Sequence, residues 1–414
     1  MFYRNVEGLG LDLFFEPGFG MDAFTPEDIV AAQTDPAVFG LKLRREPGRH
    51  RLYGRAHAHL RQSYFNSLPK DDRTVTLVKK LQHFQLIPHL LQFLSIKGPL
   101  ELIDAIDIGM GHAVYKLDVV TPSCLASVVV KSQETQNQSF FCQLLHKWGL
   151  PSYRTRHVWQ PAHQWQLSQY LSGAPLQTDL AARPLAPWLV RALGQQAAWG
   201  DVFGRGDRHP ENYVVSQDKL YPVDVTYLFW PDNDTWSHKY ISGGLYEINA
   251  LVMSPTHFDT CLALFFQAYE SSLMALAQRR QDLQHRIIAY YGAKDAHTLS
   301  KVAFIRDRLK SPRDYFIAQR QRYLTALDVY FERLPYKHKL AHLAQHNPGL
   351  MAKKPLLKMY ALADADRPSA FFLAEDQESD IFSEIDRLFR AHTPHENVPD
   401  YHAFRDALAL ELAS

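Results

Sequence analysis

The hydrophobic and polar positions of this 414-residue chain change their period along its length. After a break at Lys97-Gly98-Pro99, short apolar runs separated by glycine and proline turns predict an order of β-β-β-α-β-β. The predicted strands are 100–108, 112–120 and 125–131, followed by a helix at 136–148 and two more strands at 155–159 and 164–170. This part of the chain is therefore expected to form a small β-rich region.

Beyond Pro187 the apolar residues recur with the 3.6-residue period of helices. Residues 188–203 predict a helix, 213–215 and 220–223 a small hairpin, and nearly everything from Leu245 onward is helical in pattern. Ser311-Pro312-Arg313-Asp314 is typical of a helix start, with Asp where a capping box has Glu or Gln. The predicted fold class is α+β, with a small β-rich lobe at 98–173 and a large, mostly helical lobe at 174–414.

Residues 1–97 predict an irregular, partly helical N-terminal extension. Thr25-Pro26-Glu27-Asp28 is typical of a helix start, with a capping hydroxyl, a proline in the first turn and acids near the positive helix end. The basic side chains between Lys42 and Arg61 favour a solvated face over a docking surface for an acidic partner. His57 and His59 lack the acid or thiol partners of a metal site.

Composition and charge exclude several classes of protein. Hydrophobic residues at 46% and charged residues at 21% indicate a globular chain, and 45 basic against 44 acidic residues give no field for nucleic acid. The three scattered cysteines suit a reducing compartment. The start lacks the order of a secretory signal, and the longest apolar run, 84–96, is too short to span a bilayer. We expect a soluble cytoplasmic protein with no transmembrane segment and no nucleic-acid partner.

A polar loop, Gly204-Arg205-Gly206-Asp207-Arg208-His209-Pro210-Glu211-Asn212, carries the strongest chemical signal. Asp207 and Asn212 lie five apart in a tight turn, and Asp224 ends the apolar run 220–223. Phosphoryl transfer with a metal nucleotide needs one carboxylate to orient the attacking hydroxyl, and an amide oxygen with a second carboxylate to hold the metal. The alternative is a surface turn with a capping Asp and an ordinary Asn, and three such residues together favour the catalytic interpretation.

Two features upstream suit a phosphate site. Gly109-Met110-Gly111-His112 joins two predicted strands, where glycines let backbone amides approach phosphate oxygens; a plain two-glycine hairpin is the alternative. Lys131 ends the apolar run Val128-Val129-Val130, a costly position unless the ammonium pairs with a carboxylate or a phosphate. The alternative is an edge lysine whose stem lies along the sheet.

This order of motifs resembles the protein-kinase-like superfamily. Protein kinases proper carry His-Arg-Asp, whereas Asp207-Arg208-His209 has the order found in phosphatidylinositol 3- and 4-kinases and the large protein kinases related to them. The chain is also similar to the dehydratase domain of class II lanthipeptide synthetases, in Lys131, in the helix at 140–145 and in Pro222-Val223-Asp224-Val225. Those domains phosphorylate peptide Ser/Thr and then eliminate the phosphate. The resemblance covers about residues 100–250.

The resemblance implies ATP and Mg²⁺ as cofactors, within a two-lobed kinase-like fold. Asp207 would be the base or hydroxyl-orienting group, and Asn212 and Asp224 would hold Mg²⁺. His209 would assist at the γ-phosphate or pack inside the loop, and Arg208 would be a structural anchor.

The same resemblance implies a nucleotide site upstream. Lys131 would meet the α- and β-phosphates, and Gly109 and Gly111 would cover them. The backbone of three consecutive residues would form the adenine-side hinge: Gln169, Tyr170 and Leu171.

Two departures keep alternatives open. Val225-Thr226 follows Asp224 where most kinases have Phe-Gly, and the helix after Lys131 offers only Gln138 and Gln143 where an acidic partner is expected. The leading hypothesis is a phosphotransferase that acts on a Ser/Thr hydroxyl of a protein or peptide. The alternatives are nucleotidylation or amino-acid ligation, a nucleotide-binding pseudokinase that regulates a partner, and a phosphoinositide kinase.

Overall fold

The computed structural model describes sixteen stretches of the chain: residues 2–6, 11–15, 62, 65–109, 114–121, 124–132, 136–160, 164–182, 184–206, 208, 210–229, 246–248, 250–251, 258–293, 296–352 and 375–393. Contacts between Cα atoms divide it into two compact units. Unit 1 comprises Met1–Val38 and Lys42–Ser172, and unit 2 comprises Phe39–Leu41 and Gly173–Ser414. The fold is α+β, with a five-stranded sheet in unit 1 and mostly helices in unit 2, and is compatible with a two-lobed kinase-like arrangement.

Unit 1 contains one antiparallel sheet with the strand order β3-β4-β5-β7-β6. Its elements are β3 (Glu101–Asp107), β4 (Val114–Val120), β5 (Leu125–Ser132), α5 (Asn137–Lys147), β6 (Thr155–Trp159) and β7 (Gln164–Gln169). All six predicted elements are confirmed, with ends within two residues of the predicted ones. The prediction succeeds because the strands are short apolar runs between turns, and in β4 alternate side chains are buried, which gives that strand its two-residue period.

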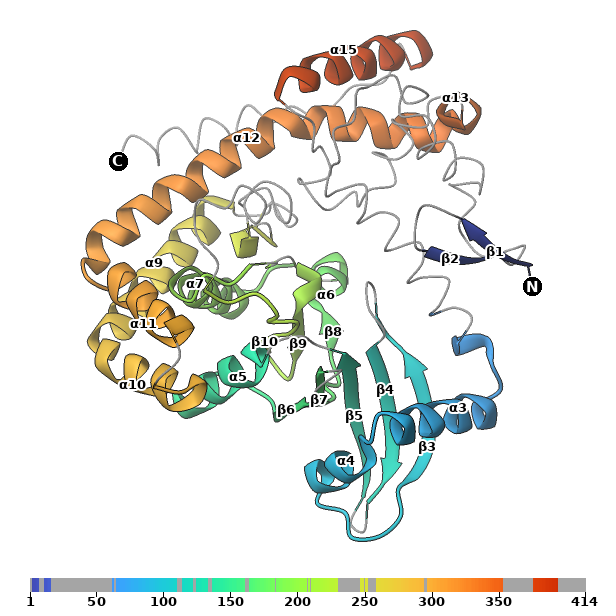
Figure 1. The fold of residues 1–414 in the computed structure, drawn as a ribbon. Helices are drawn as coiled ribbons and strands as arrows, with labels where there is room; N and C mark the ends of the chain where they lie inside the picture. The colour runs from blue at the N-terminus through green and yellow to red at the C-terminus, as the bar shows by residue number, and fades with distance from the viewer. Residues whose placement is uncertain are drawn as a thin grey trace. The chain divides into compact units, whose positions relative to one another are not determined.

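One face of the sheet is covered by two helices, α3 (Lys70–His83) and α4 (Ile87–Leu94), which cross β3, β4 and β5 in Figure 1. Their apolar side chains form one core with alternate residues of the strands, among them Leu77, Leu81, Leu90, Phe93, Leu117, Val119, Val128, Val130 and Leu167. Since Val130 points into this core, Lys131 next to it points to the opposite face of the sheet.

The first fifteen residues differ from the irregular, partly helical extension predicted for 1–97, whereas α3 and α4 agree with its helical part. Residues Phe2–Val6 (β1) and Leu11–Phe15 (β2) pair as an antiparallel hairpin. The glycines at 8 and 10, between two runs rich in large apolar residues, are typical of such a connection. The predicted helix start at Thr25, the basic run 42–61 and the His57–His59 pair lie outside the described residues.

Unit 2 opens with β8 (Ala174–Pro175), α6 (Leu176–Ala182) and α7 (Pro187–Val202), followed by η2 (Pro210–Asn212), β9 (Tyr213–Ser216) and β10 (Lys219–Pro222). β9 and β10 form the predicted hairpin, to which β8 adds a third strand. The remaining elements are η4 (Tyr246–Ile248), α9 (Phe258–Gln278), α10 (Arg280–Tyr291), α11 (Ala296–Arg308), α12 (Pro312–His346), α13 (Pro348–Ala352) and α15 (Glu375–His392). The helical character predicted from Leu245 onward is therefore confirmed in the described part, including the start of α12, although Ser311 makes no side-chain capping bond.

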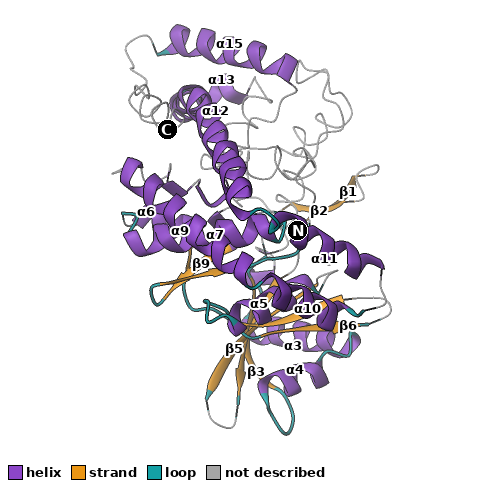
Figure 2. Ribbon diagram, turned by 90° about the vertical axis from the view of Figure 1, so that its left-hand side faces the viewer, coloured by secondary structure: helices purple, strands orange, loops and turns teal. Residues whose placement is uncertain are grey.

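Helices α7 and α9 form the centre of unit 2 and run together in Figure 2. A Cβ at Gly194 would stand 2.2 Å from the main-chain oxygen of Phe265, so the glycine allows the two backbones to approach closely. Within the described residues, one helix has the length and composition of a membrane span: Thr260–Gln278 of α9, with mean hydropathy 1.2. Because α9 buries Phe265, Tyr269 and Leu273, this apolar character is compatible with the core of a soluble protein.

Candidate functional site

The segment after β10 runs back along the polar loop that follows α7. Three main-chain hydrogen bonds join the two: Val223 N–H to Asn212 O at 2.8 Å, Gly206 N–H to Tyr227 O at 3.2 Å, and Phe229 N–H to Phe203 O at 2.6 Å. The backbone thus brings Asn212 next to Val223, the residue before Asp224. That Asn212 and Asp224 share a ligand stays a prediction.

The side chain of Arg205 joins these two segments a second time. Its Nη2 donates to the carbonyl oxygens of Asn212 (3.3 Å) and Val223 (3.1 Å), and its Nη1 donates to the hydroxyl of Tyr213 at 2.8 Å. The guanidinium also lies 4.7 Å from the centre of the Tyr213 ring. Since Arg205 is only 3% exposed, its bonds are shielded from water and hold the residue before Asp224 against Asn212.

Asp224, two residues after the end of β10, has a left-handed backbone conformation. Its φ of 55° is in the left-handed region, which costs a non-glycine residue about 1–3 kcal/mol unless the surroundings impose it. The hydroxyl of Thr226 donates to Asp224 Oδ1 at 3.0 Å and orients the carboxylate. Asp224 is exposed, whereas Asn212 is 8% exposed.

The carboxylate of Asp224 and the amide oxygen of Asn212 are both oxygen ligands of the type that Mg²⁺ prefers. Among the described residues, no group of three or more His, Cys, Asp or Glu side chains is placed to hold a metal ion. Asn212 and Asp224 therefore supply two ligands of a possible site rather than a complete set.

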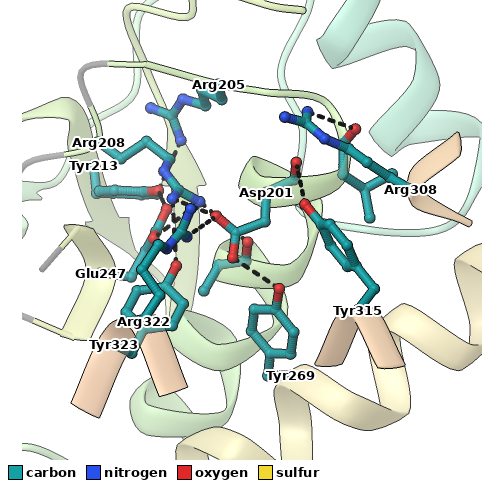
Figure 3. A network of polar contacts seen from close by, with 12 residues as sticks. Asp201, Arg205, Arg208, Tyr213, Glu247, Tyr269, Arg308, Tyr315, Arg322 and Tyr323 are labelled. Carbon is teal, nitrogen blue, oxygen red and sulfur yellow. Dashed lines mark hydrogen bonds and ion pairs between the residues drawn. The ribbon is translucent and has the colours of Figure 1, made fainter. Parts of the chain in front are cut away.

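Beneath the loop lies a buried network of charged and tyrosine side chains, drawn in Figure 3. Arg208 Nη2 lies 2.6 Å from Asp201 Oδ1, and Arg322 Nη2 lies 2.7 Å from the same oxygen. The hydroxyl of Tyr269 donates to Asp201 Oδ2 at 2.7 Å. Burial alone would raise the pKa of Asp201, but the Arg322 and Arg208 guanidiniums and the Tyr269 hydroxyl outweigh it and hold that pKa well below its ordinary value.

Gly200, in the last turn of α7, makes room for this network. A Cβ at position 200 would stand 2.1 Å from Arg208 Nη1. The guanidinium also donates to Ala197 O at 3.1 Å, so it lies flat against the helix backbone. The structure thus places Arg208 as the structural anchor that its sequence position suggested.

Glu247, in η4, ties a further segment of the chain to the loop. The Tyr213 hydroxyl donates to Glu247 Oε1, and Arg208 Nη1 lies 3.4 Å from Glu247 Oε2. Burial raises the pKa of Glu247, and the opposing effects of Arg208 and the Tyr213 hydroxyl do not cancel that rise. Arg205, Tyr213, Glu247, Arg208 and Asp201 therefore form one continuous chain of polar contacts (Figure 3).

Several predicted site residues lie outside the described residues. Asp207, His209 and Gly111 are in this group, as is Glu134, the acid nearest to Lys131 in sequence. Their proposed roles rest on the sequence alone.

In unit 1, Lys131 is partly buried and stands opposite Gln166 of β7 and Val114 of β4. Of the two glutamines in α5, Gln138 is buried and donates through Nε2 to the Tyr153 hydroxyl, whereas Gln143 is exposed. Of these two glutamines, only Gln138 lies in the interior of unit 1, and its side chain donates a hydrogen bond to Tyr153.

Some backbone amides of the predicted hinge and glycine turn already donate hydrogen bonds within unit 1. The amides of Gln169 and Tyr170 donate to the carbonyls of Arg154 (2.8 Å) and Ser127 (3.2 Å). The Gly109 amide donates to Asp107 Oδ1 at 2.9 Å. An adenine ring at this hinge would therefore have to use carbonyl groups or the Leu171 amide.

Sequence reasoning missed most of the buried network. One signal was present: Asp201 stands in the apolar run Trp199-Gly200-Asp201-Val202-Phe203, and a buried carboxylate there must be paired. The partners Tyr269 and Arg322 come from α9 and α12, and no local pattern connects them to the loop.

The chain was compared with known proteins at three levels. No protein-family model matches it, and no curated protein matches it in sequence. Among solved structures, it is similar to the PAN3 pseudokinase of Drosophila melanogaster, at 12% sequence identity over 73% of this chain and 92% of that chain, with a TM-score of 0.22. A similarity at this TM-score carries no argument about activity or site residues.

Proposed function

We propose that this protein is an ATP- and Mg²⁺-dependent phosphotransferase of an atypical kinase fold that phosphorylates a Ser/Thr hydroxyl of a protein or peptide. One observation supports the proposal: the Val223–Asn212 hydrogen bond and the Arg205 side chain hold the main chain of Asn212 against Val223, the residue before Asp224. Phosphoryl transfer requires an amide oxygen and a carboxylate on one metal ion, and this backbone contact would allow Asn212 and Asp224 to supply them.

Asn212 and Asp224 suit a Mg²⁺ ion, because both carry oxygen atoms that can coordinate it. Asn212 contributes an amide oxygen, and Asp224 a carboxylate that Thr226 orients. When bound, the ion would neutralise charge on the phosphate oxygens.

The chain's own groups would do the rest. Asp207, five residues before Asn212 in the same loop, would accept a hydrogen bond from the attacking hydroxyl and take its proton. Lys131 would place its ammonium against the α- and β-phosphates, and His209 would donate to the γ-phosphate.

A protein or peptide acceptor agrees better with the charge of the neighbouring sequence than a polyphosphorylated lipid does. Residues 225–245 contain Lys239 and His238 against Asp232 and Asp234. Recognition of a phosphorylated headgroup requires an excess of cations, which this balance does not supply.

Labelling with γ-³²P-ATP tests the proposal, with mixed candidate proteins as acceptors. Asp224→Asn keeps the size of the side chain and removes its charge, and Asp218→Asn makes the same change in the exposed β9–β10 turn. We expect the wild type and Asp218→Asn to transfer the label to an acceptor at similar rates. The rate of transfer by Asp224→Asn should be lower by at least about a hundredfold. Equal labelling by wild type and Asp224→Asn, or no labelling of any acceptor or of the protein itself, would contradict the proposal.

A second candidate function is nucleotidylation or nucleotide binding without turnover. It is favoured by the hydrogen bond from the Gly109 amide to Asp107, because that amide was expected to bind phosphate. A different phosphate geometry would suit transfer of the nucleotide itself, or binding without turnover in a pseudokinase. Label that follows the α-phosphate rather than the γ-phosphate would identify nucleotidylation. Stabilisation of the fold by ATP without transfer of either label would identify a pseudokinase.

A further inference from the structure

The carboxylate of Asp107 contacts backbone amides on both sides of the connection between β3 and β4. Asp107 is the last residue of β3 and is 1% exposed. Its Oδ1 accepts the Gly109 amide at 2.9 Å and lies 3.5 Å from the Val114 amide. One side chain thus reaches both ends of the turn that the sequence marked as a phosphate-binding element.

The position of this carboxylate is fixed by its own backbone. The Asp107 amide donates to Asn66 Oδ1 at 2.8 Å, and Asn66 Nδ2 donates to the Asp107 carbonyl at 2.9 Å. Both bonds involve main-chain atoms of Asp107, so they would persist in a variant that changes only its side chain.

The turn is also close to the strand lysine in the sheet. Val114, whose amide faces Asp107, stands directly opposite Lys131 in the pairing of β4 with β5. Asp107 itself pairs with Tyr115, whose side chain lies in the core under α3 and α4, whereas Lys131 points to the other face of the sheet. The Val114 amide therefore links the Asp107 carboxylate to the residue that stands opposite Lys131.

We propose that Asp107 is a specificity-determining residue of the nucleotide site, whose carboxylate competes with nucleotide phosphate for the amides of Gly109 and Val114. This inference rests on the proposed nucleotide-binding function. An N–H group that donates to a carboxylate at 2.9 Å is not available to a second acceptor, and charge-assisted bonds of this type are roughly twice as strong as neutral ones. The carboxylate also repels phosphate, because both are anions. Asp107 therefore lowers the contribution of the phosphates to nucleotide affinity.

The test measures affinity against the number of phosphates. Calorimetric titration of the full-length protein with adenosine, ADP and ATP in the presence of Mg²⁺ is carried out on wild type and on Asp107→Asn. The matched control is Asp104→Asn on the same strand, whose carboxylate pairs with Arg73 at 2.9 Å. We expect Asp107→Asn to bind ATP about tenfold more tightly, because a neutral amide oxygen holds the Gly109 amide less strongly than a carboxylate and does not repel phosphate, with little change for adenosine and none of this gain in Asp104→Asn.

Three results would overturn the inference. Weaker ATP binding by Asp107→Asn would show that the carboxylate organises the turn for phosphate. An equal gain for adenosine would show an effect that does not pass through the phosphates. If neither the wild type nor the variants bind nucleotide, both this inference and the proposed function are contradicted. Tight nucleotide binding without transfer of the γ-label would contradict only the phosphotransferase function. Should Asp107→Asn fail to fold, Asp107→Ser is measured in the same series.

Discussion

Nη2 of Arg208 lies 2.6 Å from Oδ1 of Asp201, and both side chains are at most 2% exposed. Asp201 stands in the last turn of α7, and Arg208 stands between Asp207 and His209 in the loop. The ion pair therefore fixes the course of the loop after the helix at the position where catalytic side chains are expected.

Replacing Asp201 with Asn is expected to lower the free energy of unfolding by about 3–5 kcal/mol at pH 7, because the buried guanidinium of Arg208 and the partly exposed one of Arg322 lose their carboxylate. Urea unfolding measures this, with exposed Asp307→Asn as the control, expected to change stability by about 0.5 kcal/mol or less. The folded-state pKa of Asp201 is depressed, so its contribution is present above the ordinary value of 3.8 and is lost as pH falls below it. A difference between wild type and Asp201→Asn that stays constant from pH 6 to pH 2.5 would contradict this assignment.

Glu247 is expected to show the opposite dependence on pH. Burial raises its folded-state pKa, so its contribution to stability is fully present below the ordinary value of 4.5 and is lost as pH rises through the folded-state value. Glu247→Gln does not titrate, and its stability relative to wild type should therefore rise as pH increases from 4.5 to 8. Urea unfolding at several pH values, with the exposed Glu332→Gln as the control, measures the trend. A relative stability that falls over this range would show that Glu247 is an ordinary ionised partner of Arg208.

Arg205→Lys is expected to raise the Mg²⁺ concentration needed for half-maximal phosphotransfer by about tenfold or more. Lysine keeps the charge but cannot reach Tyr213, Asn212 and Val223 together, and one hydrogen bond to a charged group is worth about 1.5–3 kcal/mol. Adenosine affinity should not change, which separates a positioning role from general loss of structure. Arg306→Lys, on the exposed end of α11, is the matched control. An unchanged Mg²⁺ requirement in Arg205→Lys would show that Arg205 does not position the site.

Two glycine substitutions should have opposite effects on stability. Gly194→Ala places a Cβ 2.2 Å from a carbonyl oxygen of α9, so it should destabilise the protein by at least about 1–3 kcal/mol. Gly349→Ala, in α13, meets nothing within 4 Å and should be neutral or stabilising by about 1 kcal/mol, because alanine favours helices. Thermal unfolding of both variants measures the difference. Similar melting temperatures would show that α7 and α9 can separate at little cost.

The sheet of unit 1 could be predicted from the sequence because its signals are local. The strands are short runs rich in apolar and β-branched residues, with alternating burial clearest in β4, and breaks at glycine or proline separate most of them. The N-terminal hairpin was missed because its two strands, Phe2–Val6 and Leu11–Phe15, are short and irregular in pattern. The proximity of Asn212 and Asp224 was predicted from chemistry, since both suit one metal ion.

The support of the site could not be predicted in the same way. Arg322 and Asp201 are far apart in sequence, and their contact depends on how α12 packs against α7 and α9. The Gly109 amide was expected to meet phosphate, but it donates to the Asp107 carboxylate. This could not be predicted, because an aspartate two residues before a glycine has no distinctive sequence pattern.

The layer that α3 and α4 form on the sheet has a consequence for recombinant work. A fragment that began at the Lys97-Gly98-Pro99 break would keep every strand of the sheet but would expose Leu117, Val119, Val128 and Val130 to water. An open β surface of this kind invites intermolecular association. Expression of the five-stranded sheet of unit 1 in isolation therefore has to begin before Phe65, because the helices that precede the sheet protect it from aggregation.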